Sequence, residues 1–398
     1  MSGWKYSLII LAIAFLEEDA VRAQAFAPGP LSSARLAEAA VAAGFVVDGV
    51  ETKAPTAVRP RFPLATFNYE DSALVNLREK YHLREVVSGA SDEWAAQLML
   101  MQWVHDRIKN GDPKQFPTHA QDILEFAAKG EKFWCTYFAI TYVETAQALG
   151  WQARPIGVDR RHGPEGLGST HHGVAEVWSN QFGKWVVIDP QSNLHFEKNG
   201  VPLSAWEIRA EWLKNNGANV DHVVGAPPHS KKKNPAIVWW ARKDEDETAT
   251  YFWLYVTDHA NMGIDGTTSK LIFPQDSANA HSTWYQNDSD NQRGTPHLGY
   301  VRHLFLPTEE INDAYWTVGV INVDVKDGSK GSIRFSVESY CPNRSGYEVS
   351  FDERSPELVK DETAVKWNLH QGRNTLRLRT LNRGDIRGPE TAMTLVLK

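Results

Sequence analysis

The chain has 398 residues, of which 42% are apolar and 23% charged, and its formal net charge is −7 at pH 7. This balance is ordinary for a globular protein of two or three domains, and it excludes a generically basic nucleic-acid binder. Two cysteines exclude a disulfide scaffold, and the lack of an apolar run of roughly 18 residues beyond the N-terminus excludes an integral membrane span.

The N-terminus follows the pattern of a secretory signal peptide. Lys5 supplies a positive charge, residues 6–16 form a short apolar stretch, and residues 23–25 (AQA) provide an A-x-A cleavage site. We therefore expect residues 1–25 to be removed before Phe26 and the mature protein to be secreted, in the periplasm or outside the cell. A buried N-terminal helix is the alternative interpretation.

Residues 26–70 are rich in alanine, proline and valine, and we interpret them as a linker or irregular arm with one short helix, Ser33 to Ala43. The next strong signal is a helix that starts at Ser91, its predicted N-cap. Apolar residues then recur at helical spacing until a Gly-Asp-Pro sequence at 111–113 ends the pattern.

Two further helices are predicted over residues 119–128 and 134–149, the second with Gly150 at its C-cap position. The hydrophobic pattern then changes to a period of two, which predicts a strand over residues 152–158. Residues 174–178 and 185–188 are predicted to form a hairpin. Helices followed by strands indicate an α+β fold, and we assign residues 71–224 to this domain.

The remaining sequence is predicted to be rich in strands. We expect residues 225–310 to form a β-rich middle region and residues 311–398 to form a β-sandwich, because apolar and polar residues alternate cleanly there and turn signals separate the runs. Asp327-Gly328 is one of the predicted turns. Cys341 falls in this last segment, so we expect it not to form a disulfide with Cys135.

Cys135 is predicted in the first turn of the helix that starts near Trp134. The free N–H groups and partial positive charge of a helix N-terminus stabilise a thiolate, and the same N–H groups can form half of an oxyanion hole. Cys135 is therefore a candidate nucleophile. A small buried apolar residue is the alternative role for a lone cysteine.

The hairpin supplies a candidate base and an acid to orient it. Paired residues in an antiparallel hairpin have numbers with a constant sum, and a turn centred near 181 gives about 362. His172 and Asp189 have a sum of 361, so we expect them to lie opposite each other within one residue of register. His171 is the rival base, but neighbouring strand positions face opposite sides, and we favour His172.

Four sequence patterns occur together in this region: a cysteine at a helix start (Cys135), LGWQAR at 149–154, HHGVAEVW at 171–178 and GKWVVIDP at 183–190. Together they resemble the transglutaminase-like superfamily, whose fold is related to papain-type cysteine proteases. The resemblance covers about residues 90–205, and it implies a core in which helices pack on an antiparallel sheet.

The resemblance also implies a catalytic triad of Cys135, His172 and Asp189 that transfers an acyl group from an amide. Nothing marks a site for an amine, so we favour hydrolysis over cross-linking. Phe133 replaces a glycine that usually lies two residues before the cysteine, and Val174 replaces an aromatic residue that commonly lies two residues after the histidine. These departures bear on substrate access and preference.

The expected partner is a protein or peptide amide substrate, and a substrate associated with the cell envelope or a polysaccharide is also open. Gln102 and Trp103 are candidates for the side chain that completes the oxyanion hole. We expect no cofactor, and calcium activation is not supported because no acidic loop has EF-hand spacing. A metal site of His162, His171, His172 and Asp189 is disfavoured because adjacent strand histidines point in opposite directions.

A non-catalytic scaffold that binds a polysaccharide or cell-surface polymer is the alternative function. It would use aromatic residues of the middle region, namely Trp239, Trp240, Trp253 and Tyr255. Residues 368–379 also resemble, more weakly, the last strands of fibronectin- or immunoglobulin-like modules.

Overall fold

The computed structural model describes residues 31–59, 67–159, 171–227, 230–232, 247–251, 253–257, 271–274, 305–308, 310–360 and 365–398. The expected signal peptide and its cleavage site lie outside these residues, as do His162, Trp239 and Trp240, and the side chains of His171, Trp253 and Tyr255 are not described. Among the helices that are described, none combines the length and apolar character needed to cross a membrane.

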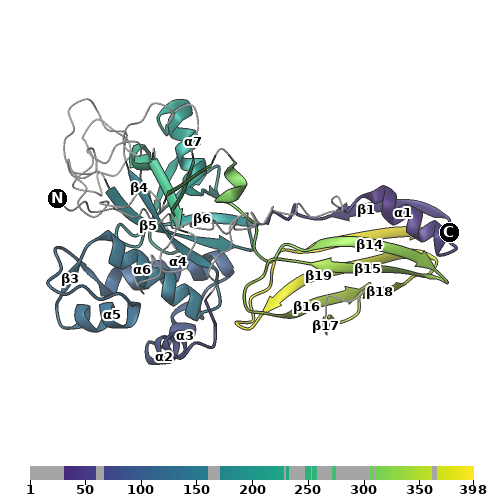
Figure 1. Ribbon diagram of the computed structural model, residues 1–398, viewed down its shortest axis with the longest axis horizontal. Coiled ribbons are helices and arrows are strands. Elements are labelled where there is room, and N and C mark those ends of the chain that lie inside the picture. Colours follow the sequence, from purple (N-terminus) through teal and green to yellow (C-terminus); the bar gives the residue numbers. More distant parts are fainter. Residues whose placement is uncertain are drawn as a thin grey trace, which may run out of the picture.

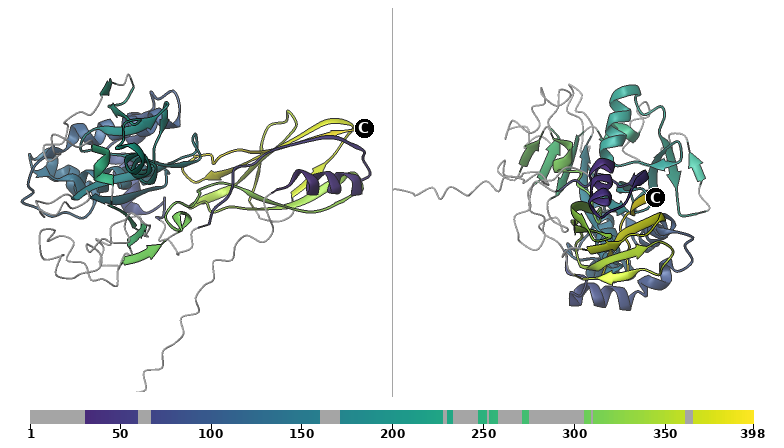
Figure 2. Two further views of the ribbon diagram at one scale, coloured as in Figure 1. Left: turned by 90° about the horizontal axis from the view of Figure 1, so that it is seen from above. Right: turned by 90° about the vertical axis from the view of Figure 1, so that its right-hand side faces the viewer.

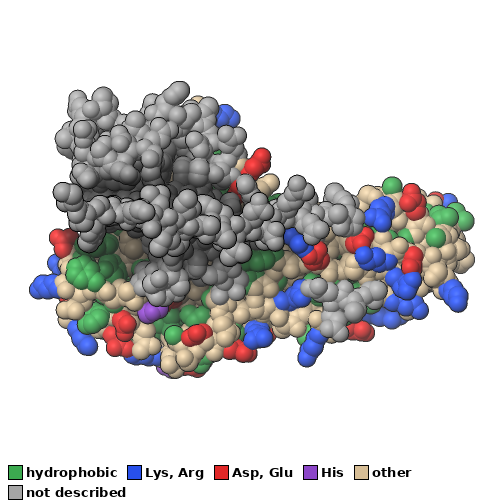
Figure 3. All heavy atoms as spheres, in the orientation of Figure 1, with side chains coloured by type: hydrophobic (Ala, Val, Ile, Leu, Met, Phe, Trp, Pro, Cys, Tyr) green, Lys and Arg blue, Asp and Glu red, His purple; other side chains and the backbone are tan. Residues whose placement is uncertain are grey.

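The molecule has two parts (Figure 1): an α+β unit formed by described residues within 67–308, and an elongated β unit formed by residues 31–53 and 322–398. The described strands of the β unit pair only in antiparallel fashion. The predicted fold class, helices packed on strands and followed by an all-β region, is therefore confirmed. Side chains of both charges are interspersed over the β unit (Figure 3).

Helix α6 is the centre of the α+β unit. The helices of this unit are α2 (Ser72–Lys80), α3 (Leu83–Val87), α4 (Glu93–Arg107), α5 (Ala120–Ala128), α6 (Cys135–Ala148) and α7 (Ala205–Asn215), with the short 3-10 helix η1 (Glu247–Tyr251). Every residue of α6 from Tyr137 onward is buried, and the helix packs against α2, α4, α5 and the sheet. A helix that is buried on all sides holds its N-terminus at a fixed place.

The ends of the helices follow local chemistry. Helix α6 ends as predicted, because Gly150 adopts a positive φ of 95° that favours glycine. The predicted N-cap of α4 is wrong by one residue: the side chain of Asp92, not that of Ser91, accepts the N–H of Ala95 at 2.9 Å. Ser91 instead hydrogen-bonds to Asp92.

The main sheet of the α+β unit has the strand order β13-β12-β11-β4-β5-β6. Its strands are β4 (Ala153–Asp159), β5 (His171–Ser179), β6 (Lys184–Ile188), β11 (Trp253–Thr257), β12 (Leu271–Pro274) and β13 (Phe305–Thr308). The predicted hairpin is confirmed as β5 and β6. A smaller sheet contains β7 (Leu194–Lys198), β8 (Val201–Pro202), β9 (Asp221–Val224) and β10 (Ser230–Lys232), and β2 (Lys109–Asn110) pairs with β3 (Lys132–Phe133).

The described strands of residues 225–310 are not a separate β-rich region. Strand β11 pairs with β4, so that Leu254 lies opposite Val158, and the strands β11–β13 extend the main sheet. Tyr251 of η1 is buried in the same core as Phe196. The middle of the chain therefore completes the α+β unit. The pairing of β11 with β4 joins residues about a hundred positions apart, and hydrophobic periodicity alone does not reveal it.

Two sheets enclose the core of the β unit. One contains β1 (Val47–Lys53), β16 (Arg344–Phe351), β17 (Glu357–Val359), β19 (Gly372–Asn382) and β20 (Thr391–Leu397), and the other contains β14 (Asn322–Ser329), β15 (Ser332–Glu338) and β18 (Val365–Asn368). The turn predicted at Asp327-Gly328 lies inside β14. The chain turns instead at Lys330-Gly331, where both residues have positive φ.

The N-terminal part of the chain belongs to this β unit. Residues 26–70 are predicted to be a linker, but β1 pairs antiparallel with β20 and forms an edge of the five-stranded sheet. Helix α1 (Ser33–Ala42), which the sequence does predict, buries Leu36 and Ala40 against the same core. Figure 2 shows α1 beside the C-terminal end of the chain.

Candidate functional site

Cys135 is the first residue of α6, as predicted. Its N-cap residue, Trp134, has an extended backbone and makes no side-chain cap hydrogen bond, so its side chain does not occupy the backbone N–H groups of the first turn. As predicted, no disulfide joins Cys135 to Cys341. Burial raises the pKa of the Cys341 thiol to about 11, so this second cysteine stays protonated and unreactive.

His172 lies between Cys135 and Asp189. Its Nε2 atom is 2.9 Å from Oδ2 of Asp189, and both side chains are buried. The imidazole also hydrogen-bonds to the sulfur of Cys135. Because Nε2 faces the carboxylate, Nδ1 is the ring nitrogen left for the thiol. The three side chains therefore form a continuous hydrogen-bonded line.

The pKa values of the two buried partners move in opposite directions. Burial lowers the pKa of His172, but the charge of Asp189 and the hydrogen bonds to Asp189 and Cys135 more than offset this, and the pKa is raised well above its usual value. Burial raises the pKa of Asp189, but His172 and Ser192 more than offset it and the pKa is lowered. His172 is thus held as an imidazolium beside the cysteine at neutral pH.

The two shifts set the pH range in which the His172–Asp189 pair stabilises the fold. The contribution of His172, whose pKa is raised, is complete below about pH 6.5 and is lost as the pH rises through the pKa of the folded state. The contribution of Asp189, whose pKa is lowered, is present above about pH 3.9 and is lost as the pH falls through its folded value.

The register of the hairpin differs from the prediction. Ala175 pairs with Ile188, which gives a sum of 363, because the four-residue turn between Ser179 and Lys184 is centred half a residue further along. The position opposite Asp189 is therefore Val174, two residues from His172. Positions two apart share a face of the strand, so His172 reaches the carboxylate as a diagonal neighbour.

The loop after β6 fixes the carboxylate of Asp189. The backbone N–H of Ser192 donates to Asp189 Oδ1 at 3.1 Å, and the backbones of Asp189 and Leu194 exchange two hydrogen bonds of 2.9 Å. His105 of α4 places Nδ1 3.1 Å from the carbonyl oxygens of both Pro190 and Gln191. Each of these contacts uses a backbone N–H or carbonyl on at least one side, and the sequence gives no signal for them beyond the helix that carries His105.

The two oxyanion candidates have other contacts. Gln102 accepts a hydrogen bond from Asn193 at 2.6 Å and donates one to Asp106 at 2.9 Å. It therefore holds Asn193, which lies in the loop after β6. The ring of Trp103 is buried, and the guanidinium of Arg107 lies 4.1 Å from its centroid. Neither set of contacts includes Cys135 or His172.

Gly173 allows α6 to approach β5 closely. A Cβ atom built at this residue would lie 3.2 Å from Thr136 Oγ1 and 3.3 Å from both Thr136 N and Cα. The backbone of Thr136 belongs to the first turn of α6, so it can move only if the turn that carries Cys135 moves with it. Glycine next to His172 therefore lets the turn that carries Cys135 lie close to the strand that carries His172.

We expect Gly173→Val to slow alkylation of Cys135 by iodoacetamide at pH 6.5 on the order of tenfold, because the larger side chain separates the helix from His172. The added methyl groups should also cost about 1–3 kcal/mol of unfolding free energy. Gly183→Val is the control, because a Cβ at Gly183 meets nothing within 4 Å. Its positive φ strains the turn, so Gly183→Val should lower stability and leave the alkylation rate near that of the wild type.

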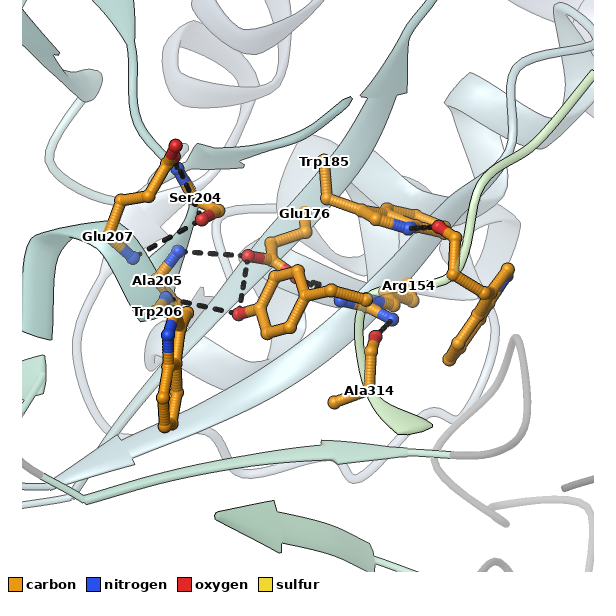
Figure 4. Close-up of polar contacts among 10 residues, drawn as sticks. Arg154, Glu176, Trp185, Ser204, Ala205, Trp206, Glu207 and Ala314 are labelled. Atoms are coloured by element: carbon orange, nitrogen blue, oxygen red, sulfur yellow. Dashed lines mark hydrogen bonds and ion pairs between the residues drawn. The ribbon is translucent and has the colours of Figure 1, made fainter. Parts of the chain in front are cut away.

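Arg154 and Glu176, two positions of the quoted patterns, form a buried ion pair on β4 and β5 (Figure 4). Arg154 Nε and Nη2 donate to Glu176 Oε2 at 3.0 and 2.6 Å. Glu176 Oε1 accepts from the N–H of Ala205, at the start of α7, and from the hydroxyl of Tyr315. Arg154 also donates to the carbonyl of Ala314. The pair thus ties α7 and the segment leading to the β unit onto the sheet.

No group of three His, Cys, Asp or Glu side chains within the described part of the chain is arranged to hold a metal ion. Of the rival metal set, His172 and Asp189 are placed together, while His162 and the side chain of His171 lie outside the description.

Comparison with known proteins supports the same region. Residues 81–190 match the family model described as the transglutaminase-like superfamily core. A solved structure of a candidate cysteine protease from Cytophaga hutchinsonii is 15% identical over 29% of this chain, with a TM-score of 0.24, and the match spans 37% of that protein. No curated protein matches the chain.

Proposed function

We propose that this protein is a cysteine-dependent enzyme that transfers an acyl group from an amide, with Cys135 as nucleophile, His172 as base and Asp189 as the residue that orients the imidazole. The observation that carries the proposal is the hydrogen-bonded line from Asp189 Oδ2 through His172 to the thiol at the start of α6. The transglutaminase-like core at residues 81–190 supports the same chemistry.

In the proposed reaction, the thiolate of Cys135 attacks the carbonyl carbon and forms a tetrahedral oxyanion. The backbone N–H groups at the start of α6 stabilise this negative charge. The carbon–nitrogen bond then breaks, the imidazolium of His172 gives its proton to the leaving amine, and a thioester with Cys135 remains. Water attacks the thioester while His172 accepts its proton, which releases a carboxylic acid and regenerates the thiolate and the imidazolium. An amine in place of water would give cross-linking.

We favour hydrolysis of a protein or peptide amide by a protein that works outside the cytoplasm, as the signal pattern of residues 1–25 suggests. The test is an untargeted digest of peptides and cell-wall amides by the wild type and by Cys135→Ala, with products read by mass spectrometry. New amine and carboxylic-acid ends should appear only with the wild type. Isopeptide bonds in place of free ends would indicate cross-linking, and identical digests would contradict catalysis.

A further inference from the structure

An exposed pair of aromatic side chains adjoins Cys135. We call Phe116 and Trp134 the aromatic ledge; they are 68% and 40% exposed. Of the Phe, Tyr and Trp side chains whose burial is described, these are the two that are exposed. Hydrophobic side chains reach the surface at the end of the α+β unit where β3 and α5 lie (Figure 3). Large apolar groups left in water at a candidate active site need an explanation.

The aromatic ledge is a built surface. The ring centroids of Phe116 and Trp134 are 6.3 Å apart. Trp134 packs on Tyr137, which in turn packs on the buried Phe133. The loop that carries Phe116 is held by Glu131, whose carboxylate accepts the backbone N–H groups of the two preceding residues, 114 and 115. Both halves of the ledge are therefore anchored before a ligand arrives.

The ledge adjoins Cys135 along the chain. Trp134 directly precedes Cys135, so their Cα atoms are about 3.8 Å apart, and one extended substrate residue spans about 3.3–3.6 Å. A carbonyl carbon bonded to Cys135 would therefore bring a neighbouring substrate side chain within reach of the two rings. Aromatic and aliphatic side chains gain most from leaving water against such a surface.

We propose that the aromatic ledge is a specificity subsite, which selects amide substrates with an aromatic or large apolar side chain in one of the two residues on the acyl side of the cleaved bond. This inference rests on the proposed function, because it takes Cys135 as the acceptor of the acyl group. It names a substrate class that the triad alone does not define.

The test uses three peptidyl chloromethyl ketones, acetyl-Gly-Gly, acetyl-Phe-Gly and acetyl-Gly-Phe, with iodoacetamide as a reagent that needs no subsite. Alkylation of Cys135 is followed by peptide mass spectrometry. One of the Phe probes should react on the order of tenfold faster than the Gly-Gly probe in the wild type. In Phe116→Ser and Trp134→Ala this ratio, normalised to iodoacetamide, should fall toward one.

Conservative and distant variants complete the test. Phe116→Tyr and Trp134→Phe should keep the ratio, and so should Leu358→Ser, which removes a similarly exposed apolar side chain from β17 of the β unit. Equal rates for all three ketones, or a ratio that survives in both ledge variants, would overturn the subsite while leaving the reactive cysteine intact. Failure of iodoacetamide to react with Cys135 below pH 7 would overturn the proposed function and the subsite with it.

Discussion

Replacement of His172 by alanine is expected to slow acylation of Cys135 by p-nitrophenyl acetate at pH 6.5 by about 10²–10⁴-fold, the usual contribution of a positioned acid–base group. The imidazolium is the group that donates a hydrogen bond to the sulfur of Cys135 and carries the positive charge beside it. Without it, the helix N-terminus alone would favour the thiolate. Release of p-nitrophenol under single-turnover conditions gives the rate.

Two matched variants sharpen this prediction. His171→Ala changes the neighbouring strand position and should leave acylation close to the wild-type rate. Asp189→Asn keeps the base but removes the charge that fixes its tautomer, so turnover should fall strongly while the thiol stays more reactive than in His172→Ala. If His171→Ala abolishes acylation and His172→Ala does not, His171 is the base.

Arg154→Met is expected to lower the unfolding free energy of the α+β unit by about 3–5 kcal/mol, the cost of leaving a buried charge without its partner. Glu176 is fully buried, and Arg154 supplies its cation. The guanidinium also lies 4.0 Å from the ring centroid of Trp185 and 4.7 Å from that of Trp316, so stacking is lost as well. Urea denaturation followed by tryptophan fluorescence measures the change.

Arg387→Met is the control for this variant. Arg387 makes two hydrogen bonds to Glu348, at 2.8 and 2.9 Å, but its side chain is 55% exposed, and exposed pairs contribute little. The double variant Arg154→Met/Glu176→Gln should recover part of the lost stability, because the amide leaves no buried charge. Equal denaturation midpoints for Arg154→Met and Arg387→Met would show that the buried pair does not hold the α+β unit together.

Local patterns in the sequence predict the parts of the fold that depend on local chemistry. The helices at residues 119–128 and 134–149 and the hairpin of β5 and β6 appear where spacing and turn residues place them. The pairing of β1 with β20 joins residues more than 300 positions apart, and an edge strand of seven residues carries no mark of its distant partner. The hydrogen bond from Tyr315 to Glu176 also joins distant positions, and no local pattern in the sequence predicts it.

The sequence likewise predicts some residues of the candidate site and not others. Cys135, His172 and Asp189 stand out because their chemistry and spacing are specific in combination. The residues that hold them are harder to find, because His105 contacts two backbone carbonyls and Ser192 donates its backbone N–H as well as making a side-chain hydrogen bond. The centre of the turn predicts the register only to within half a residue, and that difference makes His172 a diagonal rather than a direct neighbour of Asp189.

We expect His172, held as an imidazolium by Asp189, to keep Cys135 as a thiolate near neutral pH. The most direct test is the rate of Cys135 alkylation by iodoacetamide between pH 4 and 10, with the modified peptide identified by mass spectrometry. The rate at about pH 6 should already be within about threefold of its value near pH 8.5, where an ordinary cysteine is only half ionised. A rate that rises tenfold per pH unit up to about 8.5, unchanged in His172→Ala, would contradict this expectation.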